Sequence, residues 1–152
     1  MDRVLKEDDL KIRQCLESDS EYIYSLKKLT LKPYVEQIWG WDEKWNKEYF
    51  RKTFNPEIYQ IIIYKNEDIG CIAFKEEGTM IEIENIEILP RYQNLGIGSY
   101  LINQIKQKIT AQKKQIILQV FKINQKAIKF YAKHGFIKFD ESETHFKMRF
   151  DE

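Results

Sequence analysis

The alternation of apolar and polar positions predicts one strand and two helices in the N-terminal third of the chain. Residues 10–15 alternate with a period of two, which is typical of a strand. Apolar residues at helical spacing follow the capping candidates at 18–20, and Pro33 predicts that this helix ends near it. Gly40 then breaks the pattern, and Asp42 is a candidate N-cap for a second helix.

Three strand patterns follow in quick succession, starting at Ile58, Asp68 and Thr79. The short turns between them predict an antiparallel meander. In the third strand the phase changes, because Ile83 and Ile86 fall on opposite faces if the strand is regular. Either this strand is buried on both faces, or an extra residue at 84–85 forms a bulge that opens a cleft beside the strand.

Helices and strands alternate in the second half of the chain. An amphipathic helix follows the glycines at 96–98, and a strand pattern covers residues 115–121. A second amphipathic helix is predicted to end at Gly135 as its C-cap. The apolar segments on either side of residues 140–144 then predict a closing hairpin.

Composition narrows the class of protein. A length of 152 residues, with 43% hydrophobic residues, predicts a single domain over residues 1–152 with one core. The 25 basic and 24 acidic side chains balance, so we expect no nucleic-acid partner. Apolar runs such as 61–64 are too short to cross a bilayer, and we expect a cytoplasmic protein without a membrane partner. Cys15 and Cys71 lie in strand-like segments without a CxxC motif, which predicts reduced core residues and no metal site.

The stretch EILPRYQNLGIGSYL, residues 87–101, predicts an anion site where a strand ends and a helix begins. A nucleotide P-loop needs a lysine after its last glycine, and Gly98 is followed by Ser99. A dinucleotide loop needs a third small residue, and that position is Leu101. The option that remains is a loop whose backbone N–H groups, from Gln93 to Gly98, hold a pyrophosphate without a metal.

This loop, in the form ILPRYQNLGIGSYLI, resembles the acyl-CoA loop of the GNAT acetyltransferases, V-x-P-x-x-[RQ]-x-x-G-x-[GA]. NQKAIKFYAKHGF resembles the N-x-x-A-x-x-[FL]-Y-x-x-x-G-F segment of the same family. Many members carry glycine where this chain has Asn94, and asparagine tolerates a left-handed backbone. The resemblance implies an α+β fold with a mostly antiparallel sheet of six or seven strands and about four helices. A V-shaped cleft should separate the fourth and fifth strands.

The resemblance also implies the donor and the residues that bind it. The donor is acetyl-CoA, and no metal is expected. The pantetheine arm should pair with the strand backbone at Ile86, Glu87 and Ile88. In the family, a backbone N–H at the position of Ile88 polarises the acyl carbonyl. The remaining cofactor-binding candidates are Gln93, Asn94, Leu95, Gly96, Ile97, Gly98, Ser99, Asn124 and Tyr131.

For catalysis, the resemblance implies a direct attack of a primary amine on the thioester. Tyr131 matches the tyrosine that protonates the leaving thiolate, although it can also be read as a core aromatic residue. Glu82 matches the base of histone-acetylating members, and Glu84 is its alternative. A carboxylate is a weak base for an ammonium group, so either one would act through water or bind the cation.

The amine acceptor is left open by the sequence. The segment between the first two helices borders the acceptor side in this fold, so Tyr34, Trp39 and Trp41 are acceptor-binding candidates. They can equally fill the core or a subunit contact. Family habit alone suggests a homodimer. The alternative to an enzyme is a noncatalytic module of the same fold that binds or senses acyl-CoA.

Overall fold

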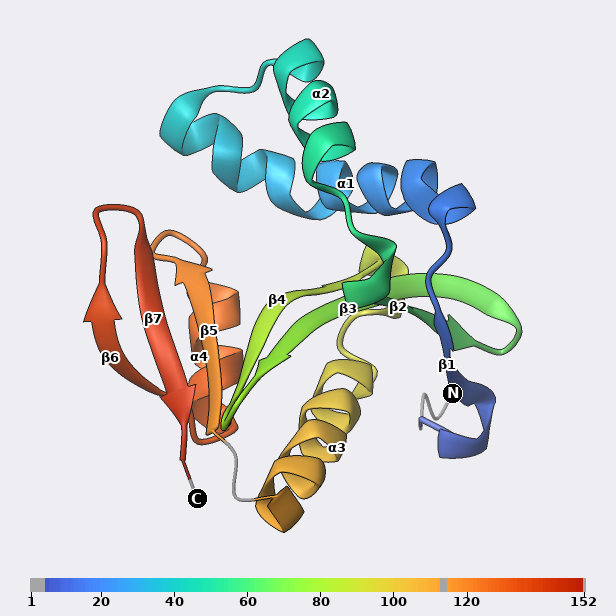
Figure 1. Ribbon diagram of the computed structural model, residues 1–152, viewed down its shortest axis with the longest axis vertical. Coiled ribbons are helices and arrows are strands. Elements are labelled where there is room, and N and C mark those ends of the chain that lie inside the picture. The colour runs from blue at the N-terminus through green and yellow to red at the C-terminus, as the bar shows by residue number, and fades with distance from the viewer. Residues whose placement is uncertain (1–4, 113–114, 152) are drawn as a thin grey trace. The chain divides into compact units, whose positions relative to one another are not determined.

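The computed structural model describes residues 5–112 and 115–151, so the ends of the predicted domain at 1–4 and 152, and residues 113–114, lie outside the described residues (Figure 1). Over the described ranges, the helices and strands run in the order β1 (Leu10–Gln14), α1 (Ser20–Trp39), α2 (Glu43–Thr53), β2 (Tyr59–Tyr64), β3 (Glu67–Glu77), β4 (Met80–Ile88), α3 (Ile97–Gln112), β5 (Gln115–Phe121), α4 (Gln125–Lys133), β6 (Ile137–Glu141) and β7 (His145–Phe150). The strands form one sheet in the order β1-β2-β3-β4-β5-β7-β6. The predicted α+β class is confirmed.

Most strand pairs in this sheet are antiparallel. β1 pairs with β2, β2 with β3, β5 with β7, and β6 with β7 in this way. β4 pairs with β5 in parallel, from Met80 opposite Gln115 to Ile83 opposite Leu118. The mostly antiparallel sheet and the closing hairpin are therefore confirmed.

The chain divides into two compact units, and β3 and β4 contribute to both. Unit 1 contains the described residues up to Ala73 together with Asn85–Leu95. Unit 2 contains Phe74–Glu84 and the described residues from Gly96 onward. The single domain stays a prediction.

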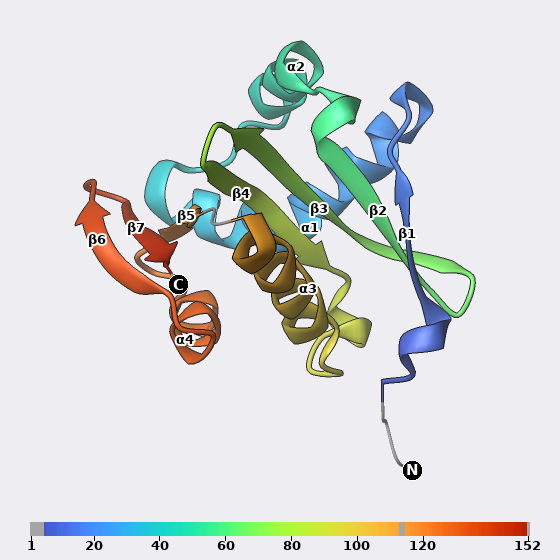
Figure 2. The ribbon, with the colours of Figure 1, turned by 60° about the horizontal axis from the view of Figure 1, so that its bottom comes forward.

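The core of unit 1 lies between α1 and the strands β2 and β3, and Figure 2 shows α1 across one face of these strands. Ile23 and Leu26 project from α1 onto Ile61 and Cys71, and each of these four side chains is at most 2% exposed. Cys15 is also buried, and both cysteines are free. The prediction that both are core residues is confirmed.

The predicted end of the first helix at Pro33 is wrong, because α1 continues to Trp39. A proline inside a helix leaves the carbonyl four residues earlier, here Leu29, without its N–H donor. Leu29 and Pro33 are both exposed, so water can bind that carbonyl. The helix ends at Gly40, whose φ of 79° is a left-handed value that favours glycine. The loop between α1 and α2 is therefore only three residues long, Gly40 to Asp42.

Asp42 begins α2 as predicted, because its Oδ1 accepts a hydrogen bond of 2.9 Å from the Trp45 N–H. In unit 2, α3 contacts β5, and α4 begins at Asn124, whose Oδ1 accepts from the Ala127 N–H at 3.1 Å. The C-cap of α4 is His134 rather than Gly135, which follows with a φ of 88°. The predicted glycine is thus one position beyond the cap, where a left-handed residue usually stands.

Candidate functional site

The end of β4 in unit 1 is held closely against β3. The Leu89 N–H donates to the Ile69 carbonyl at 2.8 Å. Gly70 lies so close to β4 that a Cβ atom on it would be 2.2 Å from the Glu87 carbonyl oxygen. The Gln93 side chain turns back and donates from Nε2 to the Ile88 carbonyl at 2.8 Å. The segment 86–88, predicted to bind pantetheine, therefore lies in contact with β3 and with the Gln93 side chain.

The side chain of Glu87 points toward α1. It is 3% exposed, and its Oε1 lies 3.6 Å from the Nζ atom of Lys27. The Cys71 thiol approaches Oε2 at 3.9 Å, and the Lys27 ammonium lies 5.4 Å from the centre of the Tyr59 ring. Burial raises the pKa of the Glu87 carboxyl above its ordinary value. The sequence analysis assigned only the backbone of Glu87, and it did not find this ion pair.

The predicted pyrophosphate loop has two left-handed residues. After a short 3-10 turn over Pro90–Tyr92, Asn94 has a φ of 63° and Gly96 has a φ of 88°. α3 then begins at Ile97, and the Tyr100 N–H donates a hydrogen bond of 2.9 Å to the Gly96 carbonyl. The N–H groups in the first turn of a helix lack partners within that helix, so they can bind an anion. The asparagine that departs from the family pattern adopts the conformation that glycine usually supplies.

In unit 2, Ser99 has a partner that the sequence analysis did not identify. Its Oγ lies 2.9 Å from Nε2 of His134 at the end of α4. Burial, with the nearby ammonium groups of Lys106 and Lys133, lowers the pKa of His134 below its ordinary value. This contact joins the first turn of α3 to the C-cap of α4.

The candidate general acid and the candidate bases also lie in unit 2. Tyr131 is half-buried on α4, with its ring 5.5 Å from that of Phe136. Glu84 forms an ion pair of 2.8 Å with Lys75. Glu82 is half-buried on β4, and within the described ranges its carboxylate has no ion pair or hydrogen bond. Of the two carboxylates, Glu84 is therefore the one held by a neighbouring lysine.

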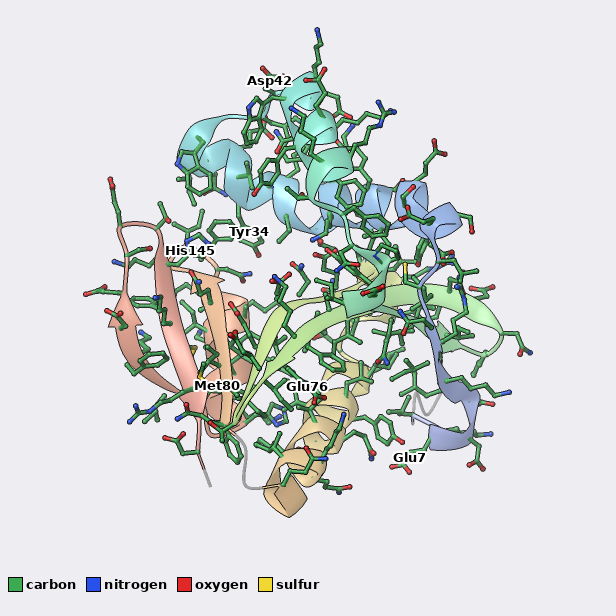
Figure 3. All side chains as sticks on the ribbon, in the orientation of Figure 1. Glu7, Tyr34, Asp42, Glu76, Met80 and His145 are labelled. Atoms are coloured by element: carbon green, nitrogen blue, oxygen red, sulfur yellow. The ribbon has the colours of Figure 1, made fainter. Side chains whose placement is uncertain are left out.

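The acceptor-binding candidates do not all lie in a loop. Tyr34 and Trp39 are on α1, and Trp39 is 62% exposed. Figure 3 labels Tyr34 on α1 and Asp42, the last residue of the loop before α2. Trp41 lies in the loop, and its Nε1 donates to the Glu43 carboxylate at 2.8 Å. That hydrogen bond, together with a 3.0 Å ion pair to Lys28, lowers the pKa of Glu43 to about 2. The ammonium of Lys32 lies 5.8 Å from the Trp41 ring, so one aromatic face already has a cation near it.

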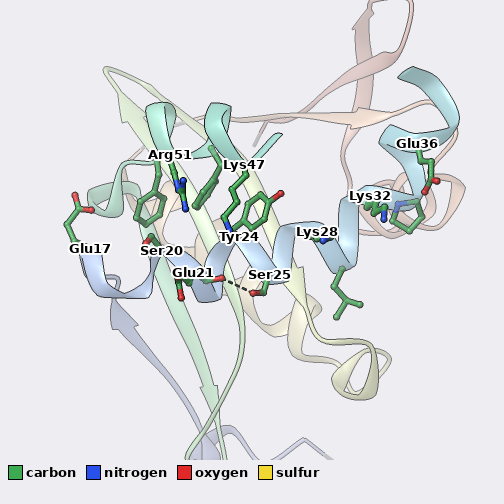
Figure 4. A pocket seen from close by; sticks show the side chains of 14 residues that line it. Glu17, Ser20, Glu21, Tyr24, Ser25, Lys28, Lys32, Glu36, Lys47 and Arg51 are labelled. Carbon is green, nitrogen blue, oxygen red and sulfur yellow. Dashed lines mark hydrogen bonds between the residues drawn. The ribbon is translucent and has the colours of Figure 1, made fainter. Parts of the chain in front are cut away.

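Unit 1 also contains an open groove of about 1070 Å³ between α1 and α2 (Figure 4). Its lining includes Tyr24, Lys28 and Lys32 from α1 and Lys47 and Arg51 from α2. None of the three acceptor-binding candidates lines it. Because Lys27 reaches β4 while its neighbour Lys28 lines the groove, the groove opens on a different face of α1 from the one that contacts β4.

Within 5–112 and 115–151, no three His, Cys, Asp or Glu side chains come together in a way that could hold a metal ion. Over the same part of the chain, no helix has the length and apolar character needed to cross a bilayer.

The fold of the mixed sheet and four helices is that of solved N-acetyltransferases. The PaiA N-acetyltransferase from Thermoplasma acidophilum, solved in complex with coenzyme A, is similar at a TM-score of 0.76 with 19% identity, and the match covers 94% of this chain and 99% of that one. Ard1 from Thermoplasma volcanium is similar at a TM-score of 0.68 with 20% identity, over 94% and 97% of the two chains. Naa50 from Arabidopsis thaliana, in complex with the bisubstrate analogue CoA-Ac-MVNAL, gives a TM-score of 0.66 with 21% identity, over 95% and 99%.

The sequence itself matches the model of the Acetyltransferase (GNAT) family over residues 22–136. The chain therefore belongs to the GNAT acetyltransferase family, and the resemblance seen in the two motifs is confirmed.

Proposed function

We propose that the protein is an acetyl-CoA-dependent N-acetyltransferase that transfers the acetyl group to a primary amine by direct attack. The observation that carries this proposal is the loop before α3, where left-handed Asn94 and Gly96 precede the free N–H groups of the first helical turn. Membership of the GNAT family and similarity to a fold solved with coenzyme A support it. Acetyl-CoA would supply the activated acyl group.

In this proposal the chain binds the donor with its backbone. The N–H groups from Asn94 to Gly98 hold the pyrophosphate, because the Gln93 N–H already donates to the Pro90 carbonyl at 3.1 Å, and Ser99 follows in the first turn of α3. The backbone of residues 86–88 pairs with the pantetheine arm. The Ile88 N–H donates to the carbonyl oxygen of the acyl group, on which negative charge develops.

The side chains then move protons. The amine nitrogen forms a bond to the acyl carbon, and the carbon–sulfur bond breaks. The amine loses one proton and the leaving thiolate gains one, so the protons balance. Glu82, acting through water, takes the amine proton, because Glu84 is engaged by Lys75. Tyr131 donates to the leaving sulfur. Trp39 and Tyr34 contribute to the acceptor side, whereas Trp41 is held by Glu43 and Lys32.

The test is release of free thiol from acetyl-CoA by the purified chain. The panel should contain a polyamine, an aminoglycoside, an amino acid, a peptide with a free N-terminus and a protein with exposed lysines. Thiol release that depends on one of these amines, with the acetylated amine identified by mass spectrometry, is the expected result. Tight binding of CoA without turnover on any amine would instead indicate the noncatalytic acyl-CoA module. Absence of both binding and turnover would reject the proposal.

A matched pair of glycine variants tests the loop. Gly96 and Gly78 both have positive φ values, 88° and 58°, and at neither would a Cβ atom meet another atom within 4 Å. Alanine therefore introduces the same kind of backbone strain at both positions. We expect Gly96→Ala to weaken CoA binding about tenfold or more by calorimetry. Gly78→Ala, in the turn after β3, should leave CoA affinity within twofold of the wild type.

A further inference from the structure

The buried ion pair between α1 and β4 is not used by the chemistry proposed above. Glu87 is the one polar or charged residue in the described ranges that is buried, with 4% of the whole residue exposed. Lys27 brings the opposite charge from α1, and its side chain is 19% exposed. Cys71 on β3, Tyr59 on β2 and Thr30 on α1 also lie beside the two charges.

Such a pair is a poor device for stability alone. Removing two charges from water costs most of what their attraction returns, and apolar residues of similar size often stabilise a fold equally well or better. A buried polar pair differs from apolar packing in being directional. It fixes one relative arrangement of the two elements that carry it.

The element fixed here is the strand segment that would polarise the acyl group. Glu87 lies between Ile86 and Ile88, and its own carbonyl is pressed against Gly70 of β3. On the C-terminal side of this segment, the Gln93 side chain donates a hydrogen bond of 2.8 Å to the Ile88 carbonyl. The Lys27–Glu87 contact therefore connects α1 to Glu87. The next residue is Ile88, whose N–H we place at the acyl oxygen.

We propose that Lys27 and Glu87 are positioning residues that hold the backbone of residues 86–88, and with it the Ile88 N–H, in the orientation needed at the acyl carbonyl. This inference rests on the proposed function. A displacement of an oxyanion donor by a fraction of an ångström affects the transition state more than it affects binding of the donor. The pair should consequently influence kcat rather than the KM for acetyl-CoA.

Three variants separate positioning from stability. Glu87→Leu removes the carboxylate that balances the largely buried Lys27 ammonium and should lower both the melting temperature and kcat. Lys27→Met/Glu87→Leu replaces the pair with apolar side chains, so the melting temperature should recover while kcat stays about tenfold below wild type and KM for acetyl-CoA stays within threefold. Glu87→Gln retains an oxygen that accepts from Lys27, and we expect kcat within threefold of wild type.

Arg13→Met is the matched control. Arg13 holds Asp19 at 2.9 Å and Asp68 at 3.2 Å in unit 1, and neither partner is on β4. Its loss should lower the melting temperature and leave kcat within twofold. Full recovery of kcat in the double apolar variant, or a fall of kcat in Arg13→Met that matches its loss of stability, would overturn the inference.

A second measurement does not depend on activity. Amide hydrogen exchange at Ile88 and Leu89 should be at least tenfold faster in the double apolar variant than in the wild type and unchanged in Arg13→Met. Unchanged exchange at both amides would overturn the inference. If the wild-type chain acetylates no amine, the proposed function fails, and the exchange rates alone decide whether the pair fixes this segment.

Discussion

Replacing Gly70 with alanine should strongly destabilise unit 1. The new Cβ would lie 2.2 Å from the Glu87 carbonyl oxygen, 3.1 Å from Ile88 Cα and 3.2 Å from the Glu87 carbonyl carbon. Ordinary van der Waals contact begins at about 3.4 Å, so the oxygen and the methyl group must separate by more than an ångström. All three contacts are with backbone atoms, and no side-chain rotation can relieve them.

The cost follows from what that separation breaks. Overpacking alone costs about 1–3 kcal/mol, and moving β4 away from β3 also lengthens the 2.8 Å hydrogen bond from the Leu89 N–H to Ile69. A hydrogen bond contributes about 1 kcal/mol net. We expect Gly70→Ala to lower the free energy of unfolding by about 3 kcal/mol, which for a chain of this size corresponds to a melting temperature about 6–12 °C lower.

Urea unfolding followed by circular dichroism measures the loss, and Gly78→Ala is the control. Gly78 has a φ of 58° and open space around its Cα, so alanine there brings only the left-handed strain of about 1 kcal/mol. Thiol release measured well below the melting temperature should also fall at least tenfold in Gly70→Ala, because the displaced residues are the ones proposed to hold the acyl group. Equal losses of stability in the two variants, with equal activity, would refute the reasoning.

Three further predictions concern the acid, a helix cap and pH. Tyr131→Phe should lower kcat by about 100-fold and change CoA affinity less than threefold by calorimetry; wild-type kcat would remove Tyr131 from the mechanism. Asp42→Ala should lower the free energy of unfolding by about 1 kcal/mol in urea titrations, because the Trp45 N–H loses its acceptor, whereas Asp42→Asn should keep most of it. The pKa of His134 is lower in the folded chain than its ordinary value of 6.5, so unfolding takes up a proton between those two pKa values and stability rises with pH in that window. His134→Gln should therefore flatten the pH dependence of the melting temperature just below pH 6.5 relative to wild type, and an unchanged slope would show that His134 does not titrate differently on folding.

Local patterns were sufficient to predict most elements. The cap at Asp42 and the closing hairpin depend on residues close to one another in sequence, and the structure confirms both. Pro33 is the exception, since its local signal ends a helix and α1 continues through it. Burial of Ile23 and Leu26 stabilises this helix as a whole, and the exposed position of Pro33 lets water bind the carbonyl that loses its donor.

The side-chain partners could not be predicted in the same way, because each requires knowing which distant elements pack together. Ser99 and His134 are 35 residues apart, and Lys27 and Glu87 come from a helix and a strand separated by three other elements of regular structure and several turns.

One signal for the pair of Lys27 and Glu87 was nonetheless present in the sequence. A glutamate between two isoleucines, in a strand followed directly by the glycine loop, either faces solvent or needs a buried cation. The complementary anomaly is Lys27 in the first helix, which is flanked in sequence by the buried Ile23 and Leu26 and by the half-buried Thr30. Each of these two charges breaks an apolar pattern, and the elements that carry them are expected to pack together. An ion pair between the two side chains therefore explains them better than separate exposure of each side chain to solvent.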